Sequence, residues 1–357
     1  MNRRIFTQAL ATSAVAAQEK RIGVALLTHA AGPHLAAYLE GLAKADEVSA
    51  VYLSDPDGQV KSAARQALGA KLTDSFRSPD ELFSRHKPAM ALVTMEARLA
   101  PPAVRSALSA GCHVLAEKPA CVKLADFEAM VRQGEQAKRS LVLALANRVD
   151  PVIVETRRIV QSGEIGKLYG VDLQIVADQT RLTNPAYHKT WVAQKARAGG
   201  GHLIWLGIHW LDLAMYVSGS RIRDVAALTA NVGGQPIDTE DSAVVALRFD
   251  TGILGTLTSG YYLDRGYHSL LKFWGSGGWI ALQKHTHKPP LEWYSGGRLH
   301  QYNGVTEPSG YTPFVRTIAR ASAGLDPWPL NAQDGLYVLK TVFAAYRSAE
   351  SDRREAV

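Results

Sequence analysis

The hydrophobic residues in the first 150 positions gather in short runs, and most runs are followed by a stretch with helical spacing. We expect strands at 21–27, 48–53, 89–94, 114–116 and 141–146, and helices at about 33–44, 59–68, 80–86, 101–110 and 125–138. Near-continuous apolar runs are typical of strands buried on both faces. Their alternation with helices predicts a doubly wound parallel sheet.

The pattern changes after Pro151. A helix at 151–162 precedes an alternating strand at 168–178, a long loop and an apolar helix at 203–217. We then expect strands at 223–231, 242–249, 253–261, 268–274 and 278–282, followed by helices at about 312–323 and 332–348. Successive strands joined by short glycine-containing turns favour an antiparallel sheet.

These patterns predict an α/β protein with two domains. Residues 20–150 form a Rossmann-type dinucleotide-binding domain with a doubly wound parallel sheet. Residues 151–357 form a second α/β domain for substrate binding and oligomerisation, with a large, open and mainly antiparallel sheet. A chain of 357 residues is long enough for two such cores.

Residues 1–19 have a different character. Arg3 and Arg4 precede a modest apolar, alanine-rich segment, and 14–16 is a small-x-small cleavage pattern. This combination predicts a twin-arginine export signal and therefore a periplasmic or otherwise exported protein. The alternative is a basic N-terminus on a cytoplasmic enzyme. We expect no membrane insertion after the signal is removed.

Composition narrows the class of partner. The net charge is +7, but Lys and Arg are interleaved with Asp and Glu, and no basic run contains aromatic residues. We therefore expect no nucleic-acid binding. The two cysteines are too few for a disulfide framework. His285, His287 and His300 lack acidic or cysteine partners at ligand spacing, so we expect no metal site.

The first expected strand ends in a small turn that could hold a dinucleotide. Thr28, His29 and Gly32 lie in this turn, and the Gly-x-Gly-x-x-Gly fingerprint is absent. Asp55 ends the second strand, where an acid accepts hydrogen bonds from ribose hydroxyls. A carboxylate there repels a 2′-phosphate, so NAD is favoured over NADP. The alternative is an ordinary strand–turn–helix with a turn aspartate before Pro56.

Glu117-Lys118-Pro119 follows the strand at 114–116. Ligands of open α/β sheets bind at the carboxyl ends of the strands. A lysine at the end of a buried strand is costly unless it is paired or used in chemistry. The alternative is an ion pair on an exposed loop.

A second candidate lies in the apolar helix that follows Gly199-Gly200-Gly201. Trp205 and His209 are four residues apart and share a helix face, and Asp212 lies one turn beyond. A neutral histidine in apolar surroundings is suited to accept a hydroxyl proton. The alternative is a core histidine that hydrogen-bonds to Asp212. Arg181, Tyr187 and Trp191, on the long loop before the glycines, are candidates for lining the substrate pocket.

These features together resemble the glucose–fructose oxidoreductase/inositol dehydrogenase family, often written Gfo/Idh/MocA, over about residues 20–350. The matching motifs are Glu117-Lys118-Pro119, Asn147-Arg148, Trp191, Gly-x-His-x-x-Asp at 207–212 and Thr239-Glu240-Asp241. The resemblance implies that Lys118 lies beside the nicotinamide and the substrate and that His209 is the acid/base. It adds Thr94, Glu117 and Asn147 to the cofactor contacts and implies a homo-oligomer formed through the open sheet.

The chain also departs from the family pattern. Thr28 and His29 replace the usual glycines, and Thr94-Met95-Glu96-Ala97 replaces a Thr-Pro-Asn-His loop. Trp205 stands where members often have an aspartate, which suggests stacking on a sugar ring or a reshaped pocket.

We therefore expect an NAD-dependent oxidoreductase that acts on a hydroxyl or ketone of a sugar or sugar derivative. Lys118 and His209 are the catalytic candidates. Two alternatives stay open at this point. One is an NAD-dependent glycoside hydrolase that uses transient oxidation and elimination, and the other is a non-catalytic sugar-binding relative.

Overall fold

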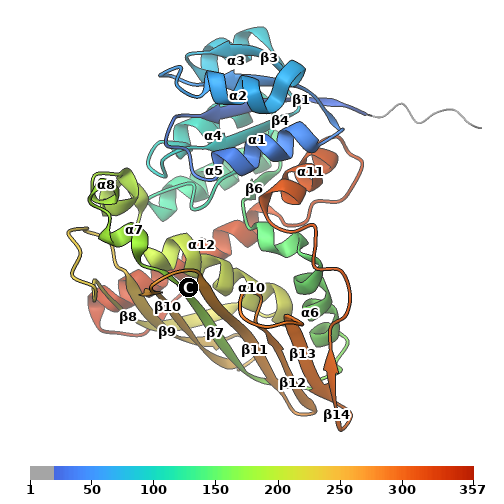
Figure 1. Ribbon diagram of the computed structural model, residues 1–357, viewed down its shortest axis with the longest axis vertical. Coiled ribbons are helices and arrows are strands. Elements are labelled where there is room, and N and C mark those ends of the chain that lie inside the picture. Colours follow the sequence, from blue (N-terminus) through green and yellow to red (C-terminus); the bar gives the residue numbers. More distant parts are fainter. Residues whose placement is uncertain (1–19) are drawn as a thin grey trace, which may run out of the picture.

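The computed structural model describes residues 20–357 (Figure 1). The expected export signal at 1–19 lies outside the described residues. Within 20–357, none of the helices combines the length and apolar character needed to cross a bilayer.

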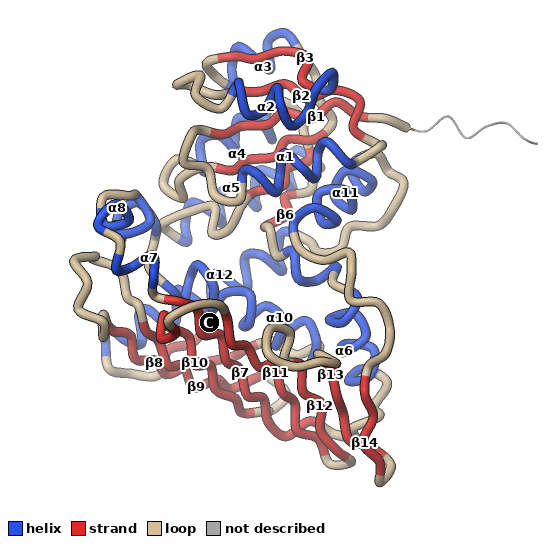
Figure 2. The backbone as a smooth tube through the Cα atoms, in the orientation of Figure 1, coloured by secondary structure: helices blue, strands red, loops and turns tan. Residues whose placement is uncertain are grey.

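The first part of the chain forms a six-stranded parallel sheet with helices on both faces (Figure 2). Its strands are β1 (Ile22–Thr28), β2 (Val48–Ser54), β3 (Leu72–Phe76), β4 (Met90–Thr94), β5 (His113–Ala116) and β6 (Leu141–Leu143). The intervening helices are α1 (Leu35–Lys44), α2 (Lys61–Leu68), η1 (Gly69–Lys71), α3 (Pro79–Arg85), α4 (Ala100–Ser109) and α5 (Leu124–Ala137). The strand order is β3-β2-β1-β4-β5-β6, which places the topological switch point between β1 and β4. Ligands of doubly wound sheets bind outside the carboxyl ends of the strands at such a point.

The sequence pattern correctly predicts five of these strands and misses β3. Residues 72–76 read Leu-Thr-Asp-Ser-Phe, and only Leu72 and Phe76 are buried. β3 lies at one edge of the sheet and pairs with β2 alone. An edge strand needs less apolar surface than a central one, so the hydrophobic pattern does not reveal it.

The second part of the chain forms a nine-stranded sheet. Its strands are β7 (Leu168–Asp178), β8 (Ile222–Ala230), β9 (Ser242–Phe249), β10 (Leu254–Leu263), β11 (Tyr267–Gly275), β12 (Gly278–Leu282), β13 (Leu291–Ser295), β14 (Arg298–Gln301) and β15 (Glu355–Ala356). The strand order is β14-β13-β12-β11-β7-β10-β9-β8-β15, and all neighbours are antiparallel except β7 and β10. The mainly antiparallel sheet is as predicted, but the sequence pattern misses β13, β14 and β15.

Helices join the strands of this second part. They are η2 (Ala146–Val149), α6 (Pro151–Gln161), α7 (Thr180–Thr183), α8 (Pro185–His188), η3 (Trp191–Ala193), α9 (Lys195–Ala198), η4 (Leu203–Gly207), α10 (Ile208–Ser218), α11 (Tyr311–Ser322) and α12 (Ala332–Ser351). Residues 180–198, expected as a long loop, contain four of these short helices. Each is three or four residues long, too short to show helical periodicity in the sequence.

The two C-terminal helices pack against both parts of the molecule. α12 contacts β8 of the second sheet, and it also contacts the helix α5 and the strand β6 of the first part of the chain. α11 packs on α1, where Gly41 lies so close that an added Cβ would be 2.8 Å from Val315 Cβ. These contacts join the two parts of the molecule.

Candidate active site

The turn after β1 is tightly packed. Thr28 is fully buried, and an added Cβ on Gly32 would lie 2.6 Å from both Thr28 Oγ1 and the Thr94 carbonyl oxygen. The Thr94 hydroxyl donates to the Pro33 carbonyl at 2.5 Å. The ends of β1 and β4 are therefore joined around Gly32, where no larger residue fits.

His29 connects this turn with the one after β4. Its Nδ1 lies 3.2 Å from the Ala31 amide nitrogen, and its Nε2 accepts from the Glu96 N–H at 2.9 Å. A neutral imidazole has a single acceptor nitrogen, so the ring satisfies one of these N–H groups at a time. Burial lowers the pKa of His29, against the opposing charge of Glu96, and favours that neutral form.

Asp55 is placed to hold a ribose. It is buried at the end of β2, and its Oδ2 accepts from the Val60 N–H at 2.7 Å. Its Oδ1 is buried and has no hydrogen-bond partner among residues 20–357. A buried carboxylate oxygen normally has a partner, and ribose hydroxyls supply one at this position of a Rossmann fold.

Lys118 crosses from the first sheet to the second domain. Its ammonium donates to the Trp205 carbonyl at 2.7 Å and lies 4.3 Å from the centroid of the Trp205 ring. Glu117 Oε1 is 3.8 Å from Lys118 Nζ, and both side chains are almost completely buried. The alternative of an exposed ion pair on a loop is therefore wrong for this pair.

Glu117 has partners that the sequence reasoning missed. The Tyr38 hydroxyl of α1 donates to Glu117 Oε2, and His34 Nδ1 lies 3.2 Å from Glu117 Oε1. The Tyr311 ring of α11 stacks on His34, with the ring centroids 4.3 Å apart. Burial raises the pKa of both tyrosines well above the ordinary value, and the charge of Glu117 adds to this. His34 is the N-cap residue of α1, and Tyr38 lies four residues later on that helix, where its N–H donates to the His34 carbonyl; this spacing could have signalled the pair.

His209 lies on α10, four residues beyond Trp205. Burial lowers its pKa well below the ordinary value, and the positive charges of Lys118 and Lys284 lower it further. Its Nδ1 is buried with no hydrogen-bond partner in the described part of the chain. His209 is therefore a neutral imidazole close to the Lys118 ammonium, and proton acceptance is the chemistry available to it.

The alternative of a core histidine suggested a hydrogen bond between His209 and Asp212. Within residues 20–357, Asp212 does not make this bond. It pairs with Arg148, whose Nη2 is 2.6 Å from Asp212 Oδ1, and both side chains are buried. Arg148 also reaches Asp334 at the start of α12, 3.1 Å away. Asp212 therefore anchors α10 to η2 and α12.

The two tryptophans lie together beside Lys118. The Trp191 and Trp205 rings meet edge to face with centroids 5.2 Å apart, and Trp191 Nε1 donates to the Ala31 carbonyl at 3.2 Å. Trp205 Nε1 is buried with no hydrogen-bond partner within residues 20–357. Trp191 thus connects the dinucleotide turn to the helix that carries His209.

The remaining candidates are more scattered. Asn147 is half-buried in η2, and its carbonyl accepts from the Asp150 N–H at 3.1 Å. Tyr187 of α8 packs against a separate small cluster that includes Leu182 and Tyr261. Arg181 lies in α7, and its side chain is outside the description. No group of three His, Cys, Asp or Glu side chains suited to hold a metal occurs within 20–357.

The switch point, the Gly32 turn and the unpartnered Asp55 oxygen all fit a bound dinucleotide. Lys118 is buried at the carboxyl end of β5, and its charge lowers the pKa of His209 on α10. Fold and site therefore define the class of nicotinamide-dependent oxidoreductases. Comparison with known proteins gives the same class. Residues 21–145 match the "Oxidoreductase family, NAD-binding Rossmann fold", and residues 153–281 match the "GFO/IDH/MocA C-terminal domain". The chain belongs to the GFO/IDH/MocA family of NAD-binding oxidoreductases.

Named relatives are distant, and one of them matches nearly the whole chain. Myo-inositol 2-dehydrogenase of Thermotoga maritima is 24% identical over 327 residues, which cover 88% of this chain and 93% of that protein. D-glucoside 3-dehydrogenase of Escherichia coli is 29% identical over 156 residues, 43% of each chain.

Solved structures share the whole fold. An oxidoreductase domain protein from Kribbella flavida has a TM-score of 0.83 at 22% identity, covering 94% of this chain and 99% of its own. The WlbA dehydrogenase from Bordetella pertussis, solved with NADH and UDP-GlcNAcA, has a TM-score of 0.81 at 21% identity with the same coverage.

Proposed function

We propose that this oxidoreductase acts on a sugar or sugar derivative, oxidising a hydroxyl group or reducing the corresponding ketone. The observation that carries the proposal is the meeting of Lys118, from the Rossmann sheet, with the helix that bears Trp205 and His209. Relatives named for inositol, D-glucoside and levoglucosan support a polyhydroxylated substrate.

The residues divide the chemistry between them. His209 accepts the proton of the substrate hydroxyl, because burial and the nearby ammonium keep its imidazole neutral. Lys118 donates a hydrogen bond to the substrate oxygen and stabilises the negative charge that develops there. A bound nicotinamide supplies the hydride acceptor. Trp191 and Trp205 supply aromatic surface beside this point.

We further propose that Thr28, His29, Gly32, Thr94 and Asn147 contact the dinucleotide and that Asp55 selects NAD over NADP. The Asp55 carboxylate repels a 2′-phosphate, while its buried Oδ1 offers an acceptor to a ribose hydroxyl.

Two measurements test the function. Mass spectrometry of nucleotide released from the purified protein should find NAD. A panel of sugars and glycosides, followed by NADH absorbance, should then yield at least one oxidised substrate. Release of an aglycone without NADH would instead indicate the redox-neutral hydrolase. Sugar binding with no bound NAD and no turnover would indicate the non-catalytic relative.

The outer face of the second sheet supports a homo-oligomer. Helices cover one face, and the other is uncovered within residues 20–357 (Figure 1). Strand register places Tyr294, Trp279 and Trp274 side by side on this outer face, with Leu254 in the same row. Leu254 is 61% exposed. We propose that a second copy of this chain covers the face, since exposed apolar patches of this kind mark interaction sites.

We also propose that the protein is exported, because Arg3, Arg4 and the apolar segment match a twin-arginine signal. With Arg3→Lys and Arg4→Lys together, we expect the full-length protein to accumulate in the cytoplasm. Cell fractionation and immunoblotting check this result. If the unmodified protein and the double variant are found in the same compartments in equal proportion, the result would support the cytoplasmic alternative.

A further inference from the structure

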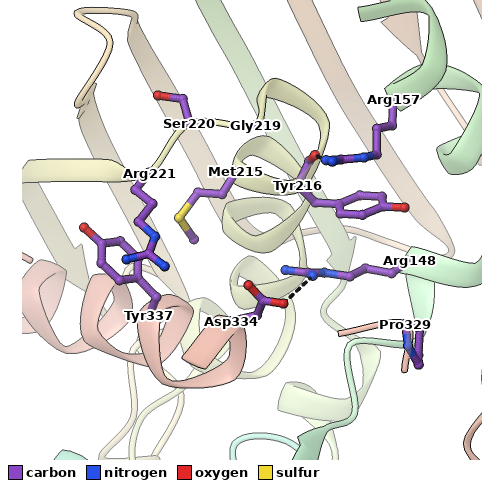
Figure 3. Close-up of a pocket in the computed structure, with 10 residues that line it drawn as sticks. All are labelled: Arg148, Arg157, Met215, Tyr216, Gly219, Ser220, Arg221, Pro329, Asp334 and Tyr337. Atoms are coloured by element: carbon purple, nitrogen blue, oxygen red, sulfur yellow. Dashed lines mark hydrogen bonds and ion pairs between the residues drawn. The ribbon is translucent and has the colours of Figure 1, made fainter. Parts of the chain in front are cut away.

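A pocket that neither Lys118 nor His209 lines lies beside the C-terminal end of α10 (Figure 3). Its volume is about 340 Å³, within the range of small-molecule sites. Its charged lining residues are Arg148, Arg157, Arg221 and Asp334, and Tyr216, Tyr337 and Ser220 add polar groups. Three arginines and two tyrosines around one cavity of this size are an unusual concentration of hydrogen-bond donors.

The guanidinium groups are held in place by stacking on aromatic rings. The Tyr216 ring has Arg148 on one side, 4.9 Å from its centroid, and Arg157 on the other, 4.5 Å away (Figure 3). Arg221 lies over the Tyr337 ring at 4.7 Å. Stacking fixes the plane of a guanidinium and leaves its edge N–H groups available for a ligand.

The charges in the pocket are incompletely balanced. Arg148 is neutralised by Asp212 and Asp334. Arg157 donates to the Tyr216 carbonyl, which carries no full charge. Within residues 20–357, neither Arg157 nor Arg221 has a carboxylate within ion-pair distance. Among the lining residues, three guanidinium groups stand against one carboxylate, that of Asp334, while Asp250 accepts a hydrogen bond from the Ser220 hydroxyl.

Nonpolar groups complete the walls. Met215 and Pro329 line the cavity together with the faces of the two tyrosine rings. The site is thus part cationic and part apolar, which suits an organic anion better than a simple hydrated ion. An arginine edge binds carboxylate and phosphate oxygens in a bidentate manner.

We propose that this pocket binds a small organic anion whose carboxylate or phosphate groups are held by Arg157 and Arg221, which lie on opposite sides of the C-terminal end of α10 (Figure 3). Neither Lys118 nor His209 lines this pocket, and the proposal does not depend on the sugar substrate. Its floor, Arg148, is joined through Asp212 to the helix that carries His209.

The test is calorimetric titration of the purified protein with inorganic phosphate and, separately, with succinate, at constant ionic strength. Saturating NAD is present, so that the dinucleotide turn does not take up the anion. Binding of at least one anion is expected, with affinity reduced at least about tenfold in both Arg157→Gln and Arg221→Gln, since each removes a charge-assisted bidentate contact. Comparison of the affinities for the two anions shows whether the pocket prefers a phosphate or a carboxylate.

Arg158→Gln is the matched control. Arg158 is the next residue on α6, is exposed and pairs with Glu155 at 2.7 Å. The Arg158→Gln variant should bind the anion as the unmodified protein does. No binding in either arm, or equal weakening in all three variants, would overturn the proposal. Circular dichroism and melting temperature identify any variant that fails to fold, and Arg221→Gln, at an exposed position on the pocket rim, then decides alone.

Discussion

Lys118 is a buried charge held by three different kinds of contact. The Trp205 carbonyl accepts its hydrogen bond, the Trp205 ring faces its ammonium, and Glu117 supplies a negative charge 3.8 Å away. A buried ammonium with such support is stable enough to fold and still able to polarise a substrate oxygen. The residue itself was visible in the sequence, but these contacts were not.

Lys118→Met should reduce turnover by at least about 10²-fold, because it removes the hydrogen-bond donor that stabilises the developing oxyanion. Methionine has similar length and tolerates the buried position. NAD affinity, measured by calorimetry, should change little. A variant that folds but no longer binds NAD would show that Lys118 serves the cofactor rather than the substrate.

His209 gives the protein a specific pH dependence of stability. In the unfolded chain its imidazole takes up a proton near pH 6.5, whereas in the folded chain burial and Lys118 lower its pKa. The unfolded state therefore binds more protons below about pH 6.5, and the free energy of unfolding falls as the pH falls, by at most about 1.4 kcal/mol per pH unit for this group. Well above that pH, His209 is neutral in both the folded and the unfolded chain and does not make the free energy of unfolding depend on pH.

His209→Asn should reduce the slope of the free energy of unfolding against pH by the contribution of about one proton. Denaturant unfolding at pH 7.5 and at several lower values, down to about pH 5, measures the slope for both proteins. The lowered pKa values of His29, His113 and His285 persist in both, so the difference isolates His209. Identical slopes for the unmodified protein and the variant would mean that His209 is protonated equally readily in the folded and unfolded states.

At the scale of elements, the segment formed by η4 and α10 organises the second domain's share of the site. It carries Trp205, His209 and Asp212 on successive turns, and it is almost entirely buried. Gly207 allows close packing, since an added Cβ would lie 2.9 Å from Ser259 Oγ. The Arg148–Asp212 pair joins this segment to η2, where the chain leaves the first sheet.

Arg148→Met should destabilise the fold by about 3–5 kcal/mol, because it leaves the carboxylate of Asp212 buried without its partner. The double variant Arg148→Met with Asp212→Leu should recover most of this loss, since it removes both charges. Thermal or denaturant unfolding measures each free energy. If the double variant is as unstable as the single one, packing rather than uncompensated charge is responsible.

At the scale of the whole molecule, the two sheets have opposite surroundings. The parallel sheet is covered on both faces, while the outer face of the nine-stranded sheet is open and carries Leu254, Val244 and Leu228 at 49–70% exposure. Charged side chains lie among these apolar ones: Lys272 is 3.9 Å from the Trp274 ring centroid, and Arg248 is opposite Leu254. Such a face is expected to pair with another copy.

Leu254→Glu should shift the protein to a smaller species in size-exclusion chromatography with light scattering. A carboxylate in this interface would lose its hydration, and the neighbouring Arg248, opposite Leu254 on β9, is already paired with Asp224 at 3.0 Å. Val154→Glu on α6 is the control, because Val154 is 47% exposed but lies on a helix rather than on the sheet. An unmodified protein that is already monomeric, or an equal shift in both variants, would argue against this interface.

The sequence predicted most of the fold because its central strands are short and apolar and its longer helices are periodic. Both sheets, five of the six parallel strands and the longer helices were predicted from these patterns. Edge strands β3 and β14 were missed because they bury little surface, and the short helices at 180–198 show no period.

The sequence by itself determined the class of fold, the carboxyl edge at which chemistry occurs, and the acidic, basic and imidazole groups available there. Only the tertiary structure decided which groups meet. Lys118 reaches Trp205 across 87 residues of chain, Tyr38 reaches Glu117 across 79, and Asp212 turns to Arg148 instead of His209. Local spacing governs helices and strands, but contacts between distant segments depend on how two sheets and two C-terminal helices pack together, which hydrophobic pattern alone does not encode.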